Sequence, residues 1–151
     1  MISRTVLAIV VLAVGATAVA AQSNPVEERV ELMNAQGKYF YGRLLRDMVE
    51  DKKPYDQATV DEAFAALVET TKRLLSLFPD TAKGQSEKGQ YFSSPKVWEN
   101  KADFEARFIQ FTKDVTEYAP EAKSLEALKV SYPAIRKNCD GCHEVYRLKK
   151  G

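Results

Sequence analysis

The chain of 151 residues carries 22 basic and 21 acidic side chains, which give a formal net charge of +1 at neutral pH. A balance this even excludes the strongly basic surface on which nucleic-acid-binding proteins depend. The length is sufficient for a single domain with a buried core.

The N-terminal segment has the features of an export signal. One positive charge, Arg4, precedes a short apolar run that ends in small residues. The small-x-small rule places cleavage after Ala20 or Ala21, and the run is too short to span a bilayer comfortably, although an uncleaved anchor is the alternative. We therefore expect a cleaved signal peptide over residues 1–21. The mature domain, residues 22–151, is expected in the periplasm with no membrane attachment.

The first helical segment follows Asn24-Pro25, where an N-cap residue precedes proline at the first helical position. Its apolar residues recur at three- and four-residue steps and predict one buried stripe. The stripe consists of Val26, Val30, Met33, Gly37, Phe40, Leu44 and Met48. We expect this helix to end near Lys52-Lys53-Pro54.

A second helix is predicted from Thr59, which can form a capping box with Glu62, to Phe78. The segment from Pro79 to Pro95 contains glycines, serines and lysines, and we expect a long loop that acts as a crossover rather than as a lid. Trp98 follows it, at a position typical of a core anchor.

Two more helices are predicted, and no segment shows a convincing strand pattern. The third should end before Pro120, and Pro133 should kink the fourth because proline removes a helical hydrogen bond. The apolar residues of the third are Phe104, Phe108, Phe111, Val115 and Tyr118. Those of the fourth are Leu125, Leu128, Tyr132, Ile135, Cys139, Cys142 and Tyr146. Four such helices predict an all-α helical bundle.

Both cysteines and the only histidine of the chain lie close together as Cys139-Asp-Gly-Cys142-His143. A thioredoxin-like dithiol requires a preceding strand, and a structural zinc ion requires four ligands, so zinc would have to recruit carboxylates. A disulfide between the two cysteines would strain a continuing helix. Helical positions i, i+3 and i+4 share one face. Two thioethers and an iron-binding imidazole can therefore come from one side, and the motif predicts a covalent haem c.

The segment RKNCDGCHEVYRLKK, near the end of an exported helical chain, resembles the class II cytochromes c, the cytochrome c′ family. ERVELMNAQG is similar to the family's first-helix segment, and KVWENKADFEARF is similar to the segment before its third helix. The resemblance covers essentially the whole mature chain. It implies an antiparallel up-down-up-down four-helix bundle with one haem c bound at one end.

The resemblance also implies roles for individual residues. By position, Cys139 and Cys142 hold the haem, and His143 is the proximal iron ligand. Arg29 lies near a haem propionate, and Arg147 flanks the proximal side. The family more often has a small flexible residue where this chain has Pro133.

Met33 corresponds to the position that faces the distal side of the haem. His143 is the only histidine, so two histidine ligands from one chain are impossible, and Met33 and Met48 are the remaining thioethers. Met33 lies about 12 Å along the first helix, level with His143, and Met48 lies about 22 Å further on. We expect His143/Met33 ligation and single-electron transfer. The alternative is a five-coordinate, high-spin cytochrome c′ that binds NO or CO at an open distal site.

We expect an electron carrier rather than an enzyme, because no nucleophile–base or paired-carboxylate arrangement can be argued. A peroxidase would also require a catalytic acid on a water-accessible distal face. The expected partner is an unidentified redox protein. A basic cluster around the haem motif can steer an acidic partner toward the haem edge, although we favour a solvated basic tail as its explanation. That cluster is Arg136, Lys137, Arg147, Lys149 and Lys150. Members of the family often form dimers through their first helices, and the adjacent aromatics Tyr39, Phe40 and Tyr41 fit such a homodimer.

Overall fold

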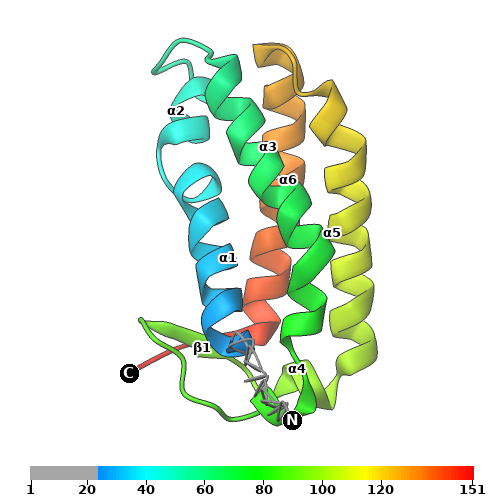
Figure 1. Cartoon of the computed structure of the whole chain (residues 1–151). Helices are drawn as coiled ribbons and strands as arrows, with labels where there is room; N and C mark the ends of the chain where they lie inside the picture. The colour runs from blue at the N-terminus through cyan, green and yellow to red at the C-terminus, as the bar shows by residue number, and fades with distance from the viewer. Residues whose placement is uncertain (1–23) are drawn as a thin grey trace, which may run out of the picture.

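The computed structural model describes residues 24–151, so the expected signal peptide lies outside the described residues. Four helical columns run up, down, up and down along one bundle, as Figure 1 shows. They are α1 (Pro25–Phe40) continued by α2 (Leu44–Val49), α3 (Gln57–Arg73), α5 (Lys101–Glu121) and α6 (Leu125–Tyr146). The predicted all-α, antiparallel four-helix bundle is confirmed. None of the helices in the described part of the chain has the length and apolar content needed to cross a membrane.

The first column is divided in two, so the prediction of one helix reaching Lys52 is wrong. The backbone N–H groups of Tyr41 and Gly42 both donate to the carbonyl of Gly37, at 2.9 and 3.0 Å, and close a tight turn. A Cβ atom on residue 42 would lie 2.2 Å from the carbonyl oxygen of Lys38. The turn that separates α1 from α2 therefore requires glycine.

The start of α3 also differs from the prediction. Asp56 is its N-cap residue, and the Asp56 carboxylate accepts hydrogen bonds from the Ala58 N–H at 3.1 Å and the Thr59 hydroxyl at 2.7 Å. Thr59 thus lies in the first turn of α3, and the predicted capping box with Glu62 is wrong. Aspartate takes the N-cap position because its carboxylate satisfies an otherwise unpaired helical N–H.

Two prolines lie inside helices. α5 continues through Pro120 to Glu121, so its predicted end before Pro120 is wrong by two residues. A proline in the last turn removes only one helical hydrogen bond, and the N–H of Ala122 still donates to the Tyr118 carbonyl at 3.0 Å. α6 likewise continues through Pro133 to the end of the haem-motif segment.

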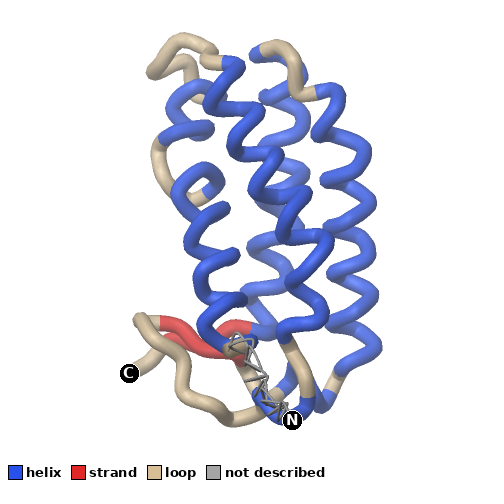
Figure 2. The backbone as a smooth tube through the Cα atoms, viewed as in Figure 1, coloured by secondary structure: helices blue, strands red, loops and turns tan. Residues whose placement is uncertain are grey.

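A two-stranded antiparallel sheet lies at one end of the bundle, although the sequence showed no strand pattern (Figure 2). Strand β1 (Tyr91–Ser93) pairs with β2 (Arg147–Lys149) so that Tyr91 faces Lys149. The short helices η1 (Leu74–Leu77), η2 (Asp80–Ala82) and α4 (Lys96–Glu99) complete this end. The segment expected as a loop therefore contains a strand. The backbone of the basic segment after α6 is paired with that strand, while the side chains of residues 148–150 are exposed.

Two apolar clusters fill the bundle. The main core lies between the end of α1, α2, α3, α5 and α6, and it contains Tyr39, Phe40, Leu45, Met48, Val60, Ala63, Phe64, Leu67, Val115, Ala122, Leu128 and Ile135. The end cluster contains Val97, Phe104 and Tyr146, with Phe78 and Trp98 packed against it. Trp98 also donates its indole N–H to the Pro79 carbonyl at 3.1 Å. Tyr39 and Phe40 are buried in the main core of one chain. The predicted homodimer through the first helices is not tested by the structure of a single chain, and it stays a prediction.

Candidate haem site

A cavity of about 610 Å³ is lined by residues of α1 and α6, among others. In Figure 1, α1 begins and α6 ends at the same end of the bundle. α6 packs on α2 and α5, and Tyr132 and Arg136 of α6 both donate to the carbonyl of Phe40, the last residue of α1, at 3.0 Å. The volume of the cavity is in the range of small-molecule and cofactor sites. Residues 87–93 of the predicted crossover form part of its wall. Its apolar lining includes Phe78, Phe104, Phe108 and Phe111.

The three residues of the predicted haem motif all line this cavity. Cys139, Cys142 and His143 lie in α6, at positions that share one helical face. Both cysteines are free thiols, so the disulfide alternative is wrong. Within residues 24–151, no group of three or more His, Cys, Asp or Glu side chains is arranged to hold a metal ion.

The protein around the motif keeps these three groups neutral. Burial raises the pKa of the Cys139 thiol to about 12 and that of the Cys142 thiol to about 11. Burial also lowers the pKa of His143 to about 4, and the positive charge of Arg147 acts in the same direction. A neutral imidazole retains the lone pair that a metal ligand must donate.

Of the methionines in the described residues, only Met33 lines the cavity. It is half-buried on α1, and the Gln36 side-chain amide donates to its sulfur at 3.6 Å. Met48 is buried in the main core and does not line the cavity. The structure therefore agrees with the expected separation of the two thioethers along the first column.

Arg29 is buried at the cavity wall, with 2% of its surface exposed. Its guanidinium forms an ion pair with Glu87 at 2.7 Å, donates to the Leu77 carbonyl at 3.1 Å and lies over the Phe78 ring at 4.9 Å. The Glu87 carboxylate also accepts from the Ser93 N–H at 2.7 Å. The Arg29 Nε atom has no hydrogen-bond partner among the described residues. The sequence did not point to Glu87.

Arg147 also lines the cavity, at the start of β2. Its guanidinium carbon lies 4.3 Å from the centroid of the Tyr91 ring, so strand pairing and a cation–π contact fix its position. Of the predicted basic cluster, Arg136 is also engaged by the protein: it donates to the Phe40 carbonyl at 3.0 Å and to Asp140 at 3.1 Å.

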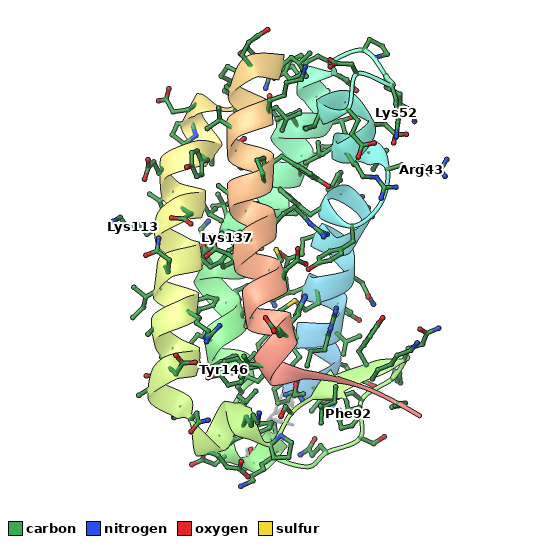
Figure 3. The ribbon with its side chains drawn as sticks, turned by 180° about the vertical axis from the view of Figure 1, so that it is seen from behind. Arg43, Lys52, Phe92, Lys113, Lys137 and Tyr146 are labelled. Carbon is green, nitrogen blue, oxygen red and sulfur yellow. The ribbon has the colours of Figure 1, made fainter. Side chains whose placement is uncertain are left out.

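A network between α5 and α6 was missed by the sequence analysis. Arg107 donates to the carbonyl of Gly141, inside the haem motif, at 2.8 Å and to Asp103 at 2.7 Å. The Tyr146 hydroxyl donates to the same Asp103 carboxylate at 2.5 Å. Figure 3 shows Tyr146 beside the end of α6, whereas Lys113 points outward from the bundle. These hydrogen bonds attach the haem motif to α5. In the sequence, the only indication of this network is the four-residue spacing between Asp103 and Arg107.

The sequence also did not point to the position of Tyr41 beside the haem motif. The Tyr41 hydroxyl donates to Asp140 at 2.6 Å and lies 3.1 Å from His143 Nδ1. Burial and this hydrogen bond to Asp140 raise the pKa of Tyr41, so the phenol keeps its proton. Its position among three adjacent aromatics in the sequence did not reveal this contact.

The residues of the cavity fit a haem. Two neutral thiols can bond its vinyl groups, a neutral imidazole can bind its iron, and the unpaired Arg29 Nε can meet a carboxylate. Gly37 lines the cavity inside α1, where glycine costs about 1 kcal/mol relative to alanine. Apart from its chain neighbours and the nearby backbone of α1, a Cβ atom there would have no protein atom within 4 Å. Such open space beside a helix backbone suits the close approach of a bound group.

Comparison with known proteins agrees with this geometry. The family model of cytochrome c′ matches residues 24–147. The chain is 38% identical to cytochrome c-556 of Rhodopseudomonas palustris over 149 residues, which cover 98% of this chain and 99% of that protein. It is 35% identical to cytochrome c-555 of Bradyrhizobium diazoefficiens, over 97% of each chain.

Solved structures show the same fold. The structure of oxidized R. palustris cytochrome c556 gives a TM-score of 0.71 at 36% identity and covers 86% of this chain and 100% of that one. Cytochrome c′ from R. palustris gives 0.73 at 27% identity with the same coverage. The chain therefore belongs to the cytochrome c′ family and, like its relatives, carries a covalently bound haem c with its iron.

Proposed function

We propose that the chain is a periplasmic electron carrier in which Cys139 and Cys142 hold the haem and His143 and Met33 bind the iron. The observation that carries this proposal is the position of Met33 and His143 on one cavity, Met33 from α1 and His143 from α6. The motif at the end of α6 and the export signal add support. The partner is an unidentified redox protein.

The haem supplies one-electron iron chemistry when bound. Cys139 and Cys142 would hold the haem on α6 through two thioethers, and His143, in the same motif, would bind its iron. The hydrogen bond from Arg107 to the Gly141 carbonyl holds that motif in place. A Met33 thioether favours the reduced iron, because methionine–histidine ligation raises the potential of c-type haems. Arg29 offers its unpaired Nε to a propionate, and the apolar wall limits access of water.

Substitution of the methionine tests the axial ligation. In Met33→Ala the oxidised protein should change from low-spin to high-spin, lose its sulfur-to-iron absorption band near the red edge and bind CO more readily. Met48→Ala is the matched control, because Met48 lies in the main core. It should lose about 2–5 kcal/mol of unfolding free energy and keep its spectrum. A wild type that is high-spin in both oxidation states contradicts Met33 ligation.

A second candidate function is binding of NO or CO at an open distal position. The observation in its favour is the hydrogen bond from the Gln36 amide to the Met33 sulfur at 3.6 Å, which can hold the thioether as packing over the iron. Gln36 is itself held by the Thr70 hydroxyl at 3.3 Å. The same spectra separate the two functions, since an open site takes up CO in the wild type without any substitution.

A further inference from the structure

One side of the His143 ring is engaged by a side chain from the first column. The Tyr41 hydroxyl lies 3.1 Å from His143 Nδ1, and the two ring centroids are 5.9 Å apart. The same hydroxyl donates to Asp140 Oδ1 at 2.6 Å. Asp140 lies inside the Cys-x-x-Cys segment, three residues before His143, so the contact joins two parts of the haem motif to α1.

The fold holds Tyr41 in this position from several directions. Its backbone N–H donates to the Gly37 carbonyl, in the tight turn between α1 and α2 that contains Gly42. The Arg136 guanidinium lies 3.8 Å from the centroid of the Tyr41 ring and donates to Asp140 Oδ2 at 3.1 Å. Tyr41 and Asp140 therefore share one arginine, which fixes the phenol relative to the carboxylate.

The positions of the protons follow from these distances. A phenol has one proton to donate, and a carboxylate only accepts hydrogen bonds, so the proton of Tyr41 lies toward Asp140. The short O···O distance of 2.6 Å is that of a charge-assisted bond. The Tyr41 oxygen then presents a lone pair to His143 Nδ1. This arrangement selects the tautomer with the proton on Nδ1 and the free lone pair on Nε2.

We propose that Tyr41, supported by Asp140, is a positioning residue for the axial imidazole and lowers the reduction potential of the haem. The Nδ1–H group of His143 donates to Tyr41, and the phenol donates to the carboxylate. An acceptor on the second ring nitrogen orients a metal-bound histidine and makes it a stronger electron donor, which stabilises the oxidised iron. The inference rests on His143 being an iron ligand, as proposed above, and is independent of Met33.

The test is the reduction potential of the Tyr41→Phe holoprotein. Loss of the acceptor should shift the equilibrium toward reduced iron about tenfold, which is about 59 mV for one electron. Tyr39→Phe is the matched control: its hydroxyl donates to Glu62 at 3.0 Å and Tyr39 does not line the cavity, so the potential should not change. The substitution Asp140→Asn replaces the carboxylate that accepts the hydrogen bond of Tyr41 with a weaker acceptor. The reduction potential of the haem should therefore rise, but by less than in Tyr41→Phe.

Proton NMR of the reduced protein supplies a readout that a merely structural role would not move. The His143 Nδ1–H signal should exchange slowly with solvent in the wild type and rapidly in Tyr41→Phe. Wild-type values of both the potential and the exchange rate in Tyr41→Phe would overturn the inference and leave the proposed function intact. If Tyr41→Phe does not fold, the same two readouts on Asp140→Asn decide. A wild type without an axial imidazole overturns the proposed function and this inference together.

Discussion

The two halves of the bundle are built from the same kind of amphipathic helix, yet only one half contains the large cavity. In the half next to α2, fully buried side chains such as Leu45, Leu67 and Leu128 close the main core. In the other half, the same stripe of α1 continues through Met33 and Gly37 and faces the cavity. Helical periodicity therefore identifies which face is covered, but it does not distinguish a face covered by side chains from one covered by a cofactor.

The two halves should also differ in what stabilises them. The main core depends on apolar burial that each helix supplies to the others. The cavity half depends on the haem, on the buried Arg29–Glu87 ion pair and on the pairing of β1 with β2. Each of the following changes acts on one half and leaves the other as its internal reference.

Loss of the haem should have the largest effect. In a Cys139→Ala/Cys142→Ala chain without haem, amide hydrogen exchange in α1, β1 and the last turns of α6 should approach the rate of an unfolded chain. Protection in α3 around Leu67 should persist, because its packing partners belong to the main core. Exchange measured by mass spectrometry on the haem-bound and haem-free chains checks this. Equal loss of protection in both halves would contradict the claim that only the cavity half depends on the haem.

Removal of the buried Arg29 guanidinium should have the second-largest effect. Arg29→Met leaves the Glu87 carboxylate buried without its partner, and we expect a loss of about 3–5 kcal/mol in unfolding free energy. Lys129→Met is the matched control, because Lys129 pairs with Asp51 at the surface, where an ion pair contributes about 0–1 kcal/mol. Denaturant unfolding of both variants measures the difference. Equal losses of unfolding free energy would mean that the buried ion pair stabilises the fold no more than the surface ion pair does.

A cavity made in the main core should have a similar or slightly smaller cost. Leu67→Ala should lose about 2–5 kcal/mol of unfolding free energy and keep the absorption spectrum of the haem unchanged. Ile109→Ala, at a side chain that is 66% exposed on α5, should stay within about 0.5 kcal/mol of the wild type. A changed spectrum in Leu67→Ala would show that the two halves are coupled.

Local patterns predicted most of the fold, and contacts between distant residues account for what was missed. The four stripes correspond to the four columns, because helical periodicity is a property of neighbouring residues. The division of the first column depends on the close approach of residue 42 to the Lys38 carbonyl, which no stripe reveals. The pairing of Tyr91 with Lys149 joins two three-residue strands that are far apart in the chain.

The haem site shows the same difference between local sequence patterns and contacts of distant residues. Cys139, Cys142 and His143 could be predicted because their chemistry depends on a spacing within one helix. Tyr41 and His143 are 102 residues apart, and Arg29 and Glu87 are 58 apart, so their contacts exist only once the bundle has formed. The resemblance to the family pointed to Arg29 and Met33 at the cavity but not to the residues that hold them.

The most direct test of the account is proton NMR of the reduced protein with labelled methionine methyl groups. Met33 and Met48 are the only methionines in the sequence apart from Met1. If Met33 binds the iron, its methyl signal lies far upfield in the ring current of a diamagnetic haem, and the Met48 signal stays near its ordinary position. The volume-conserving variant Met48→Leu assigns the two signals. Two methionine signals near their ordinary positions, or a paramagnetic reduced state, would contradict the proposed ligation.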